Sequence, residues 1–325
     1  MNVPRSGSTL LCTVLDAHPR LSIVIESVWF SYHAVNLRRL GKKPAIQREE
    51  TLFEYLKSAP QIERLAPDED EIRRAIAGSD GKLEVVFDRL CSSWSRQRAE
   101  PNSICGEKSC AHALYIDQIH RAYPEAKFIH LIRDPRATVY SLSKKSFGGQ
   151  SNSVYVNIHV WRRYHDGMIR SLRTVADTHK LTVYYEDFVI DTEKQTRRIC
   201  EFIGVDFDPV MMEHHKLHRE IPKRFGSQKA NDPVSDSFVD QWRTSLTPLQ
   251  ISCIEDLTLD SDLVRRYELV RPSVNVVART VAMVYARWLG VVLGWLERIF
   301  ARVRGGPFVW SEAGRLLKKL LRIAS

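Results

Sequence analysis

The sequence predicts an α/β fold in which a P-loop-like, mostly parallel sheet is flanked by helices and followed by C-terminal amphipathic helices. Short apolar segments alternate with helical ones as far as about residue 204, as in open parallel sheets. Segment 127–132 is a near-continuous apolar run, with four apolar residues of six, which is typical of a parallel strand buried on both faces. A loop of small residues leads directly into a helical pattern near the N-terminus. For 325 residues with 44% hydrophobic content we expect one large domain over 1–270 and a helical tail over 271–325.

Local signals set the predicted boundaries of the elements. Leucine and valine recur at helical spacing after residue 8, and His18-Pro19 ends that helix. Asp134 can cap a helix whose first residue is Pro135. Helices are expected over 8–16, in several pieces within 48–99, over 111–123, from 135, over 154–176 and over 192–204; strands are expected over 21–25, 103–106, 127–132 and 181–185.

Ligands of open parallel sheets bind beyond the carboxyl ends of the strands. In this sequence five segments reach that edge, with Arg5, Glu26, Lys108, Arg133 and Glu186 at or just after a strand end. The loop should itself follow a buried strand, but Met1–Val3 supplies only the last residues of one. We therefore expect the first strand to be truncated in this sequence.

The loop, PRSGSTLL over 4–11, predicts an anion site. Its backbone N–H groups and the start of the following helix favour negative charge, and its hydroxyls add donors. It lacks the G-x-x-x-x-G-K-[ST] pattern, whose lysine and hydroxyl serve nucleoside triphosphate and Mg²⁺. We therefore expect the anion to be bound without a metal. The loop residues expected to contact it are Arg5, Ser6, Gly7, Ser8 and Thr9.

A second anion signal follows the strand at 127–132. Arg133 stands at the strand tip, and Ser141 lies two turns into the next helix, so both can grip one phosphate. A single Arg-Asp pair is more often a structural salt bridge. Together with the loop, however, it implies a ligand with phosphate-like groups at two ends.

These two segments resemble those of the PAPS-dependent sulfotransferases, whose donor is 3′-phosphoadenosine 5′-phosphosulfate (PAPS). PRSGSTLL is similar to the loop that holds the 5′-phosphosulfate, and RDPRATVYSLSK over 133–144 is similar to the segment that grips the 3′-phosphate. LDAHP over 15–19 with Glu26 resembles the stretch carrying the catalytic glutamate of tyrosylprotein sulfotransferases and their bacterial relatives. The resemblance covers about residues 4–246.

The resemblance implies roles for individual residues. Glu26 would accept the acceptor's proton, and Lys108 with Arg5 would stabilise charge on the departing oxygen. Tyr185, in YYEDF over 184–188, resembles a residue near the nucleotide. A later donor-binding segment has only a weak counterpart, Ser227 and Lys229, because Asp232-Pro233 stands where Lys-Pro is expected.

Other readings of single residues remain open. Glu26 and Lys108 could be surface residues after strands, with Lys108 paired to Glu107, and Tyr185 could be a half-buried strand residue. His18 and His112 are alternative bases. The histidines at 214, 215 and 218 lack a carboxylate or cysteine to complete a zinc set. The rival functions are a P-loop-type nucleotide kinase and a non-catalytic, membrane-associated nucleotide-binding module.

The formal net charge of +9 is concentrated in the tail. Residues 271–325 carry ten Lys/Arg against two Asp/Glu, which leaves 38 against 37 for the rest. A nearly neutral body argues against nucleic-acid binding. The six cysteines form no metal or disulfide spacing, so reduced thiols in the cytoplasm are expected.

The tail contains two amphipathic segments, 274–300 and 314–323. Each carries basic residues on one side and apolar residues on the other, which suits adsorption to an anionic membrane, with 274–323 peripheral on its inner face. The alternative is a helical hairpin packed on the body or on another subunit. The acceptor is a hydroxyl whose class stays open between lipid-linked, carbohydrate, peptide tyrosine and small-molecule compounds.

Overall fold

The computed structural model describes residues 1–33, 45–59, 62–65, 67–96, 104–144, 152–217, 228–259 and 261–304. Its strands are β1 (Leu21–Ile25), β2 (Ile104–Lys108), β3 (Phe128–Ile132) and β4 (Lys180–Tyr184). Its longer helices are α1 (Ser8–Asp16), α3 (Ala45–Ser58), α4 (Glu69–Ile76), α5 (Leu83–Arg96), α6 (Ile116–Ala122), α7 (Pro135–Lys144), α8 (Val154–Leu172), α9 (Tyr185–Ile190), α10 (Thr192–Ile203), α11 (Gln241–Ser245), α12 (Pro248–Thr258), α13 (Ser261–Arg266) and α14 (Val276–Arg304).

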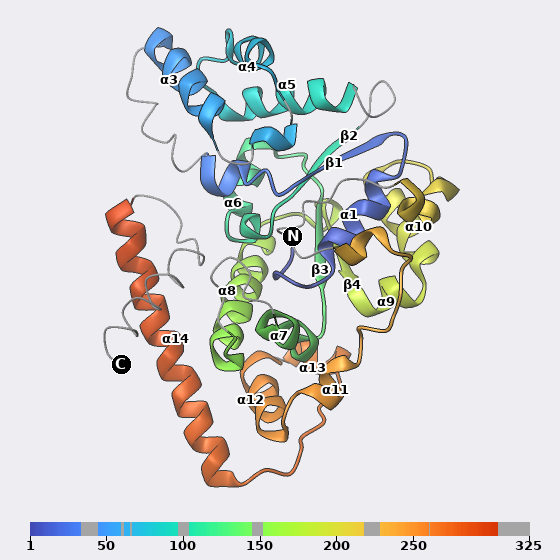
Figure 1. Ribbon diagram of the computed structural model, residues 1–325, viewed down its shortest axis with the longest axis vertical. Coiled ribbons are helices and arrows are strands. Elements are labelled where there is room, and N and C mark those ends of the chain that lie inside the picture. Colours follow the sequence, from blue (N-terminus) through green and yellow to red (C-terminus); the bar gives the residue numbers. More distant parts are fainter. Residues whose placement is uncertain are drawn as a thin grey trace.

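The strands form two parallel pairs, β1 with β2 and β3 with β4 (Figure 1). The N-terminal residues lie along β3. Asn2 forms a parallel bridge with Leu131, and the N-terminal ammonium donates to the carbonyl of Ile129 at 2.6 Å. The Asn2 amide also reaches the Sγ of Cys110, two residues after β2, at 3.4 Å. The fold class predicted from the sequence is therefore confirmed.

Strand β3 is buried on both faces, as its apolar run predicts. Phe128 and Ile132 pack into one core with α5, α6 and α8, whereas Leu131 packs into a second core with α1, α9 and α10. This alternation follows from the two-residue period of a strand. Helices thus cover both faces of the β3–β4 pair, while α3, α4 and α5 gather beyond β1 and β2 (Figure 1).

The predicted boundaries hold closely for α1 and β1, and β3 differs by one residue. The predicted strand 181–185 was wrong at its end, because β4 stops at Tyr184 and Tyr185 begins α9. The expected helix 111–123 is a short 3-10 helix, Cys110–Leu114, followed by α6. Asp134 caps α7 as expected, since its Oδ1 accepts from the N–H of Arg136 at 2.8 Å.

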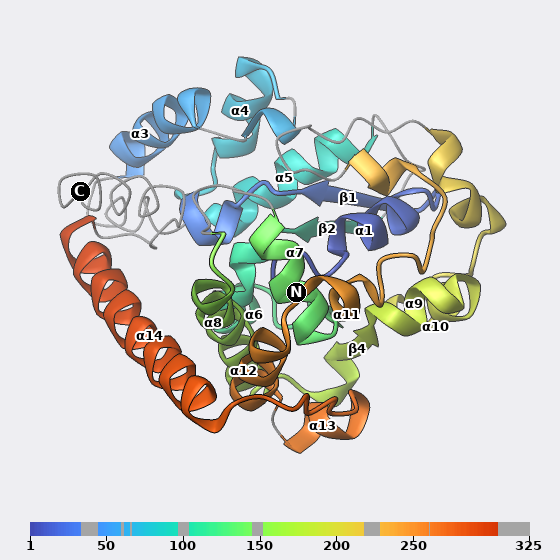
Figure 2. The same cartoon turned by 60° about the horizontal axis from the view of Figure 1, so that its bottom comes forward.

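The predicted amphipathic helix of the tail is α14, which is 29 residues long. It runs beside α8 and α12 at the edge of the body in both views (Figures 1 and 2). Leu293 of α14 packs with Leu142 and Val160 in a small apolar cluster. The second expected helix, 314–323, lies outside the described residues.

Candidate active site

The loop at 4–7 adopts the backbone conformation that an anion cradle requires. Arg5 and Gly7 have φ angles of 73° and 90°, and α1 begins at Ser8. The N–H of Ser6 donates back to the carbonyl of Val3 at 3.2 Å, which closes the turn. Alternation of left-handed and ordinary residues before a helix start turns successive N–H groups toward one point.

Gly7 lies directly against Tyr185. A Cβ atom built on Gly7 would be 2.4 Å from Cδ2 and Cε2 of the Tyr185 ring. Neither the left-handed backbone nor this contact leaves room for a side chain. The loop glycine therefore sets how closely the first residue of α9 approaches the loop.

Arg133 also contacts the Tyr185 ring. Its guanidinium carbon is 4.4 Å from the ring centroid, a cation–π contact. Its Nη1 donates to the carbonyl of Arg5 at 3.2 Å and its Nη2 to that of Phe238 at 2.6 Å. Arg133 is only 8% exposed, and within the described ranges its Nε has no hydrogen-bond partner.

Ser141 meets the side chain of Arg5. The Arg5 Nε donates to the Ser141 Oγ at 3.2 Å, so the loop and the 133–144 segment form one site. Burial, followed by the positive charge of Arg133, lowers the pKa of the Arg5 guanidinium. In the described part of the chain neither arginine makes an ion pair with a carboxylate. Two partly buried cations without a counter-charge favour an anionic ligand.

Glu26 and Lys108 form the second half of the site. Glu26 follows the end of β1, Lys108 is the last residue of β2, and Lys108 Nζ lies 2.5 Å from Glu26 Oε1. Glu26 has a φ of 60°, and its N–H donates to the Lys108 carbonyl at 2.6 Å. Burial alone would lower the pKa of Lys108, but Cys110 and Glu26 beside it raise the pKa overall. Lys108 is therefore a cation held against a carboxylate.

A buried network fixes the residues next to Glu26 and Lys108 in the chain. Glu107 Oε2 lies 2.5 Å from Nδ1 of His112, and its Oε1 accepts from Ser27 at 2.8 Å and Ser109 at 2.6 Å. Burial would raise the pKa of Glu107, but His112 and the two hydroxyls lower it overall. The Nε2 of His112 accepts from the N–H of Phe30 at 3.2 Å, so the ring proton is on Nδ1.

One alternative reading is wrong in this light, because Glu107 pairs with His112 and not with Lys108. Both ring nitrogens of His112, one of the two alternative bases, contact protein groups. His18 is engaged in the same way, because its Nδ1 accepts from the N–H of Arg20 and its Nε2 contacts the carbonyl of Asp206 at 2.8 Å.

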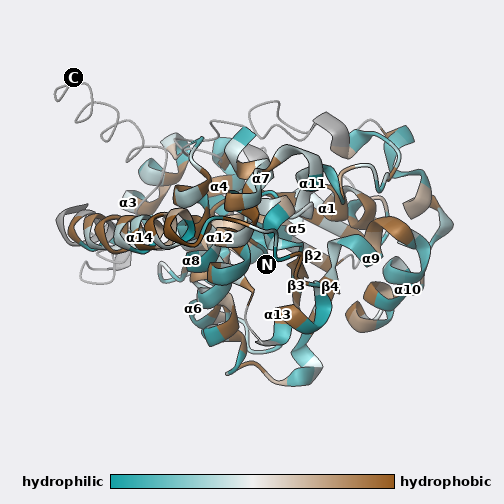
Figure 3. Cartoon of the chain, turned by 90° about the horizontal axis from the view of Figure 1, so that it is seen from below, coloured by the Kyte–Doolittle hydropathy of each residue, from teal (hydrophilic) through white to brown (hydrophobic). Residues whose placement is uncertain are grey.

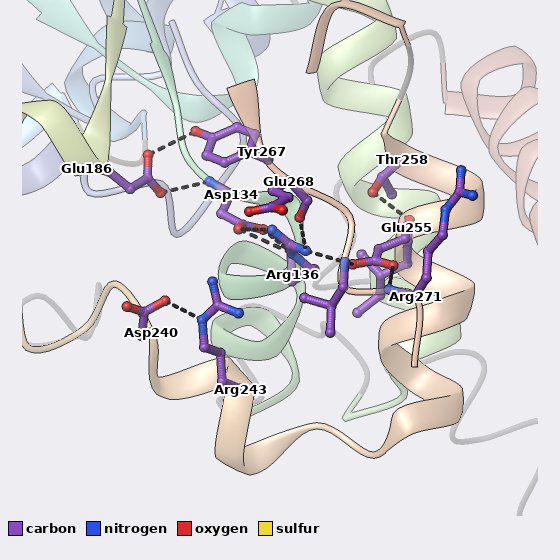
Figure 4. Close-up of polar contacts among 12 residues, drawn as sticks. Asp134, Arg136, Glu186, Asp240, Arg243, Glu255, Thr258, Tyr267, Glu268 and Arg271 are labelled. Carbon is purple, nitrogen blue, oxygen red and sulfur yellow. Dashed lines mark hydrogen bonds and ion pairs between the residues drawn. The ribbon is translucent and has the colours of Figure 1, made fainter. Parts of the chain in front are cut away.

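The residues after Arg133 build a buried ionic network (Figure 4). Arg136 bonds to Asp134 through Nη2 at 2.8 Å and to Glu255 through Nη1 at 2.6 Å. Glu186 accepts from the N–H of Asp134 at 2.9 Å and from the Tyr267 hydroxyl at 2.8 Å. Burial raises the pKa of Glu186 despite these bonds. The structural role of Arg136 was not predicted from the sequence, because its partners Glu255 and Glu268 lie more than a hundred residues away along the chain.

A cavity of about 220 Å³ adjoins this network. Ionic and polar side chains line it, among them Asp134, Arg136, Glu186, Arg243 and Tyr267. Arg243 is bound to Asp240 at 2.8 Å, and Arg136 is saturated by its two carboxylates. The cavity therefore lies beside Asp134 and Arg136. Arg5 and Arg133, the two cations without a carboxylate partner among the described residues, lie at the loop instead.

The structure brings together most of the residues expected from the sequence. The loop, Arg133, Ser141 and Tyr185 form one group of contacts, and Glu26 and Lys108 form another, with Cys110 Sγ 3.6 Å from Glu26 Oε1. Ser227 lies outside the described residues. Lys229 belongs to a short 3-10 helix, Gln228–Asn231, but its side chain is not described.

The chain is similar in sequence to known sulfotransferases. The chain is 28% identical to protein-tyrosine sulfotransferase A of Caenorhabditis elegans over 273 residues, which is 81% of this chain and 63% of that protein. The chain thus spans less than two thirds of that relative's length.

Two solved structures share the fold. The sulfotransferase domain from the curacin biosynthetic pathway has a TM-score of 0.53 at 19% identity, with coverage of 82% of this chain and 96% of that one. The sulfotransferase domain of the Synechococcus PCC 7002 olefin synthase has a TM-score of 0.52 at 22% identity, with coverage of 80% and 93%. The model of the sulfotransferase family matches residues 2–209, and the chain belongs to that family.

Proposed function

We propose that this chain transfers the sulfuryl group of PAPS to a hydroxyl acceptor without a metal. The observation that carries the proposal is the pair of cations Arg5 and Arg133, partly or fully buried and without a carboxylate partner in the described residues, beside a loop that opens a helix. A ligand with anionic groups at two ends fits this arrangement. The loop lacks the G-K-[ST] element, whose lysine and hydroxyl hold ATP and Mg²⁺ in kinase loops.

The residues divide into donor-holding and reacting groups. Loop residues 5–9 would hold the phosphosulfate, and Arg133 with Ser141 would hold the 3′-phosphate, above the ring of Tyr185. The unpartnered Nε of Arg133 is a donor available for that phosphate. Ser227 and Lys229 would add contacts at the weakly matched segment. When bound, the donor supplies the electrophilic sulfur.

Glu26 would accept the proton of the acceptor, and Lys108 would stabilise the negative charge on the departing oxygen. Their ion pair helps to keep Lys108 protonated, which is the state needed to stabilise a departing oxygen. Lys108 must leave Glu26 for the developing negative charge, and this frees the carboxylate to act as base. Arg5 would share in this stabilisation, since it lies near Cys110, whose Sγ is 3.6 Å from Glu26 Oε1.

Glu26→Gln tests the base. The amide keeps the shape of the carboxylate but cannot take a proton, so kcat should fall by about 100-fold to 10,000-fold while donor affinity stays near that of the parent. The matched control is Glu71→Gln, a carboxylate that caps α4 far from the site. Full activity of Glu26→Gln with a verified acceptor would remove Glu26 from its role.

Arg133→Ala tests the 3′-phosphate grip. Calorimetry with adenosine 3′,5′-bisphosphate should show affinity weaker by about tenfold to a hundredfold, the cost of one hydrogen-bonded charge. Binding of adenosine 5′-phosphate should change little. The exposed Arg243→Ala is the control. If Arg133→Ala weakens both nucleotides equally, the assignment of the 3′-phosphate is wrong, and preference of the parent for ATP with Mg²⁺ would favour a kinase instead.

The proposed acceptor carries a hydroxyl group on a peptide tyrosine, a lipid-linked compound, a carbohydrate or a small molecule. Relatives named protein-tyrosine sulfotransferases support the tyrosine class. Incubation of extracts with PAPS and the protein should yield a product heavier by about 80 Da, the mass of the added SO₃. Glu26→Gln serves as the inactive control.

We also propose a cytoplasmic location, peripheral on the inner face of a membrane. All six cysteines are free in the structure, which suits a reducing compartment. The membrane part depends on the basic tail.

A further inference from the structure

Helix α14 is apolar on two opposite sides. Ala282, Ala286 and Leu293 are buried against the body. The outer stripe, as we call the opposite side, consists of six side chains that are 56–71% exposed: Val277, Val281, Val284, Trp288, Val291 and Trp295. At 100° per residue they fall within a sector of about 80°, roughly opposite the buried one. Figure 3 shows that apolar residues recur along the whole helix.

The outer stripe is a continuous unpartnered surface in the described structure. Isolated exposed hydrophobic residues are ordinary, but a row of six, two of them tryptophans, marks an interaction site. The row follows α14 over most of its length of about 44 Å. An apolar surface of this length requires an occupant.

The charges beside the stripe are basic. Arg287 and Arg298 are exposed along one edge, and residues 271–325 carry ten Lys/Arg against two Asp/Glu. Tryptophan rings with a neighbouring arginine suit the zone between lipid headgroups and acyl chains. The positive charge favours anionic lipid in particular.

A second copy of the chain fits the stripe less well. The stripe residues are spaced alternately by four and three positions, as in the seam of a coiled coil. The positions that flank the seam, however, carry the charge of Arg287 and no acidic partner for it. Tryptophans at two seam positions also exceed the size of the usual interlocking residues. A lipid surface requires neither charge pairing nor interlocking side chains, so it fits the outer stripe better than a second copy does.

The packing of α14 also distinguishes a helix that lies on a membrane from one that spans it. By length and composition Val276–Leu296 could cross a bilayer. Yet Leu293 packs on Leu142 and Val160, and Arg279 bonds to Asp256 at 2.6 Å. A spanning helix would have to lose these contacts, whereas a helix lying flat keeps them and still buries the outer stripe.

We propose that α14 docks flat on an anionic membrane surface, with the outer stripe inserted among the lipid headgroups and with Arg287 and Arg298 at their level. This inference gives the proposed membrane location a specific surface and orientation. It is independent of the sulfuryl-transfer chemistry, since docking needs neither PAPS nor an acceptor.

Vesicle sedimentation with the full chain tests the proposal. We expect the parent to bind vesicles of phosphatidylcholine with added phosphatidylglycerol more tightly than pure phosphatidylcholine, and tryptophan emission to shift to shorter wavelength on binding. Trp288→Ser with Trp295→Ser should weaken binding by about tenfold or more. The control Ile190→Ser removes a 70% exposed apolar residue from α9 and should bind as the parent does.

Four other outcomes would overturn the proposal. The first is no binding of the parent to anionic vesicles. The second is that the parent does not bind vesicles but forms a dimer, whereas the double variant does not dimerise. This result would assign the stripe to a second copy. The third is binding that only detergent reverses, which would indicate a spanning helix. The fourth is unchanged vesicle binding of the double variant. Binding of adenosine 3′,5′-bisphosphate by the double variant should equal that of the parent, so that failure of docking and failure of the proposed function are separable.

Discussion

Replacing Gly7 by alanine tests the contact on which the loop depends. Gly7 has a φ of 90°, and a new Cβ would lie 2.4 Å from the Tyr185 ring. The left-handed backbone costs an alanine about 1–2 kcal/mol. Displacing a packed ring adds about 1–3 kcal/mol. Gly7→Ala should therefore lower the free energy of unfolding by about 2–5 kcal/mol.

Gly78→Ala is the matched control. Gly78 has a φ of 65°, but nothing lies within 4 Å of the position of its Cβ. It should lose only the backbone part, about 1–2 kcal/mol. Urea unfolding of both variants isolates the collision with the ring, and equal losses would refute the reasoning.

A double-mutant cycle locates the strain. If the collision is with Tyr185, then Tyr185→Ala in the Gly7→Ala background should cost about 1–3 kcal/mol less than in the parent. The same change beside Gly78→Ala should be additive within about 0.5 kcal/mol. Because Arg133 stacks on this ring, Gly7→Ala should also weaken the binding of adenosine 3′,5′-bisphosphate.

The remaining predictions concern the two buried networks. Arg136→Met should destabilise the fold by about 3–5 kcal/mol in urea unfolding, because Asp134 and Glu255 lose their buried counter-charge; a loss below about 1 kcal/mol would contradict this. His112→Ala removes the partner that holds the pKa of Glu107 below its ordinary 4.5. A lowered pKa stabilises the fold above the ordinary value and loses this effect as pH falls through the lowered one, so the variant should be less stable than the parent at neutral pH, by a margin that shrinks below pH 4.5. A margin independent of pH would exclude this linkage.

Features with a local cause were predictable from the sequence. Helix α1 follows from the loop before it and the leucine spacing within it, and α7 follows from the cap at Asp134 and Pro135. Strand β3 could be recognised because both of its faces are apolar. The meeting of Glu26 with Lys108 follows from the parallel pairing of two strands that end together.

Features caused by distant contacts were not predictable. The apolar pattern of β4 continues through Tyr185, but the strand ends before it. At this point Glu186 accepts a hydrogen bond from the N–H of Asp134, and the Tyr185 ring packs against Gly7. In the same way, no local pattern distinguishes Arg133, with its unpartnered Nε, from Arg136, which is saturated by carboxylates. The two arginines of one motif thus divide into a candidate ligand residue and a structural one.

Helix α12 connects the segment that carries Arg133 and Arg136 to helix α14. Its Glu255 holds Arg136, three residues from Arg133, and the next residue, Asp256, holds Arg279 at the start of α14. Neighbouring side chains of one helix therefore fasten both the turn that carries Arg133 and the long helix at the edge of the body. If that helix rests on a bilayer, the protein cannot swivel freely above it. The reacting groups would then stand at a constant height and tilt over the lipid, and the reach of an acceptor from the membrane would become a criterion for selecting it.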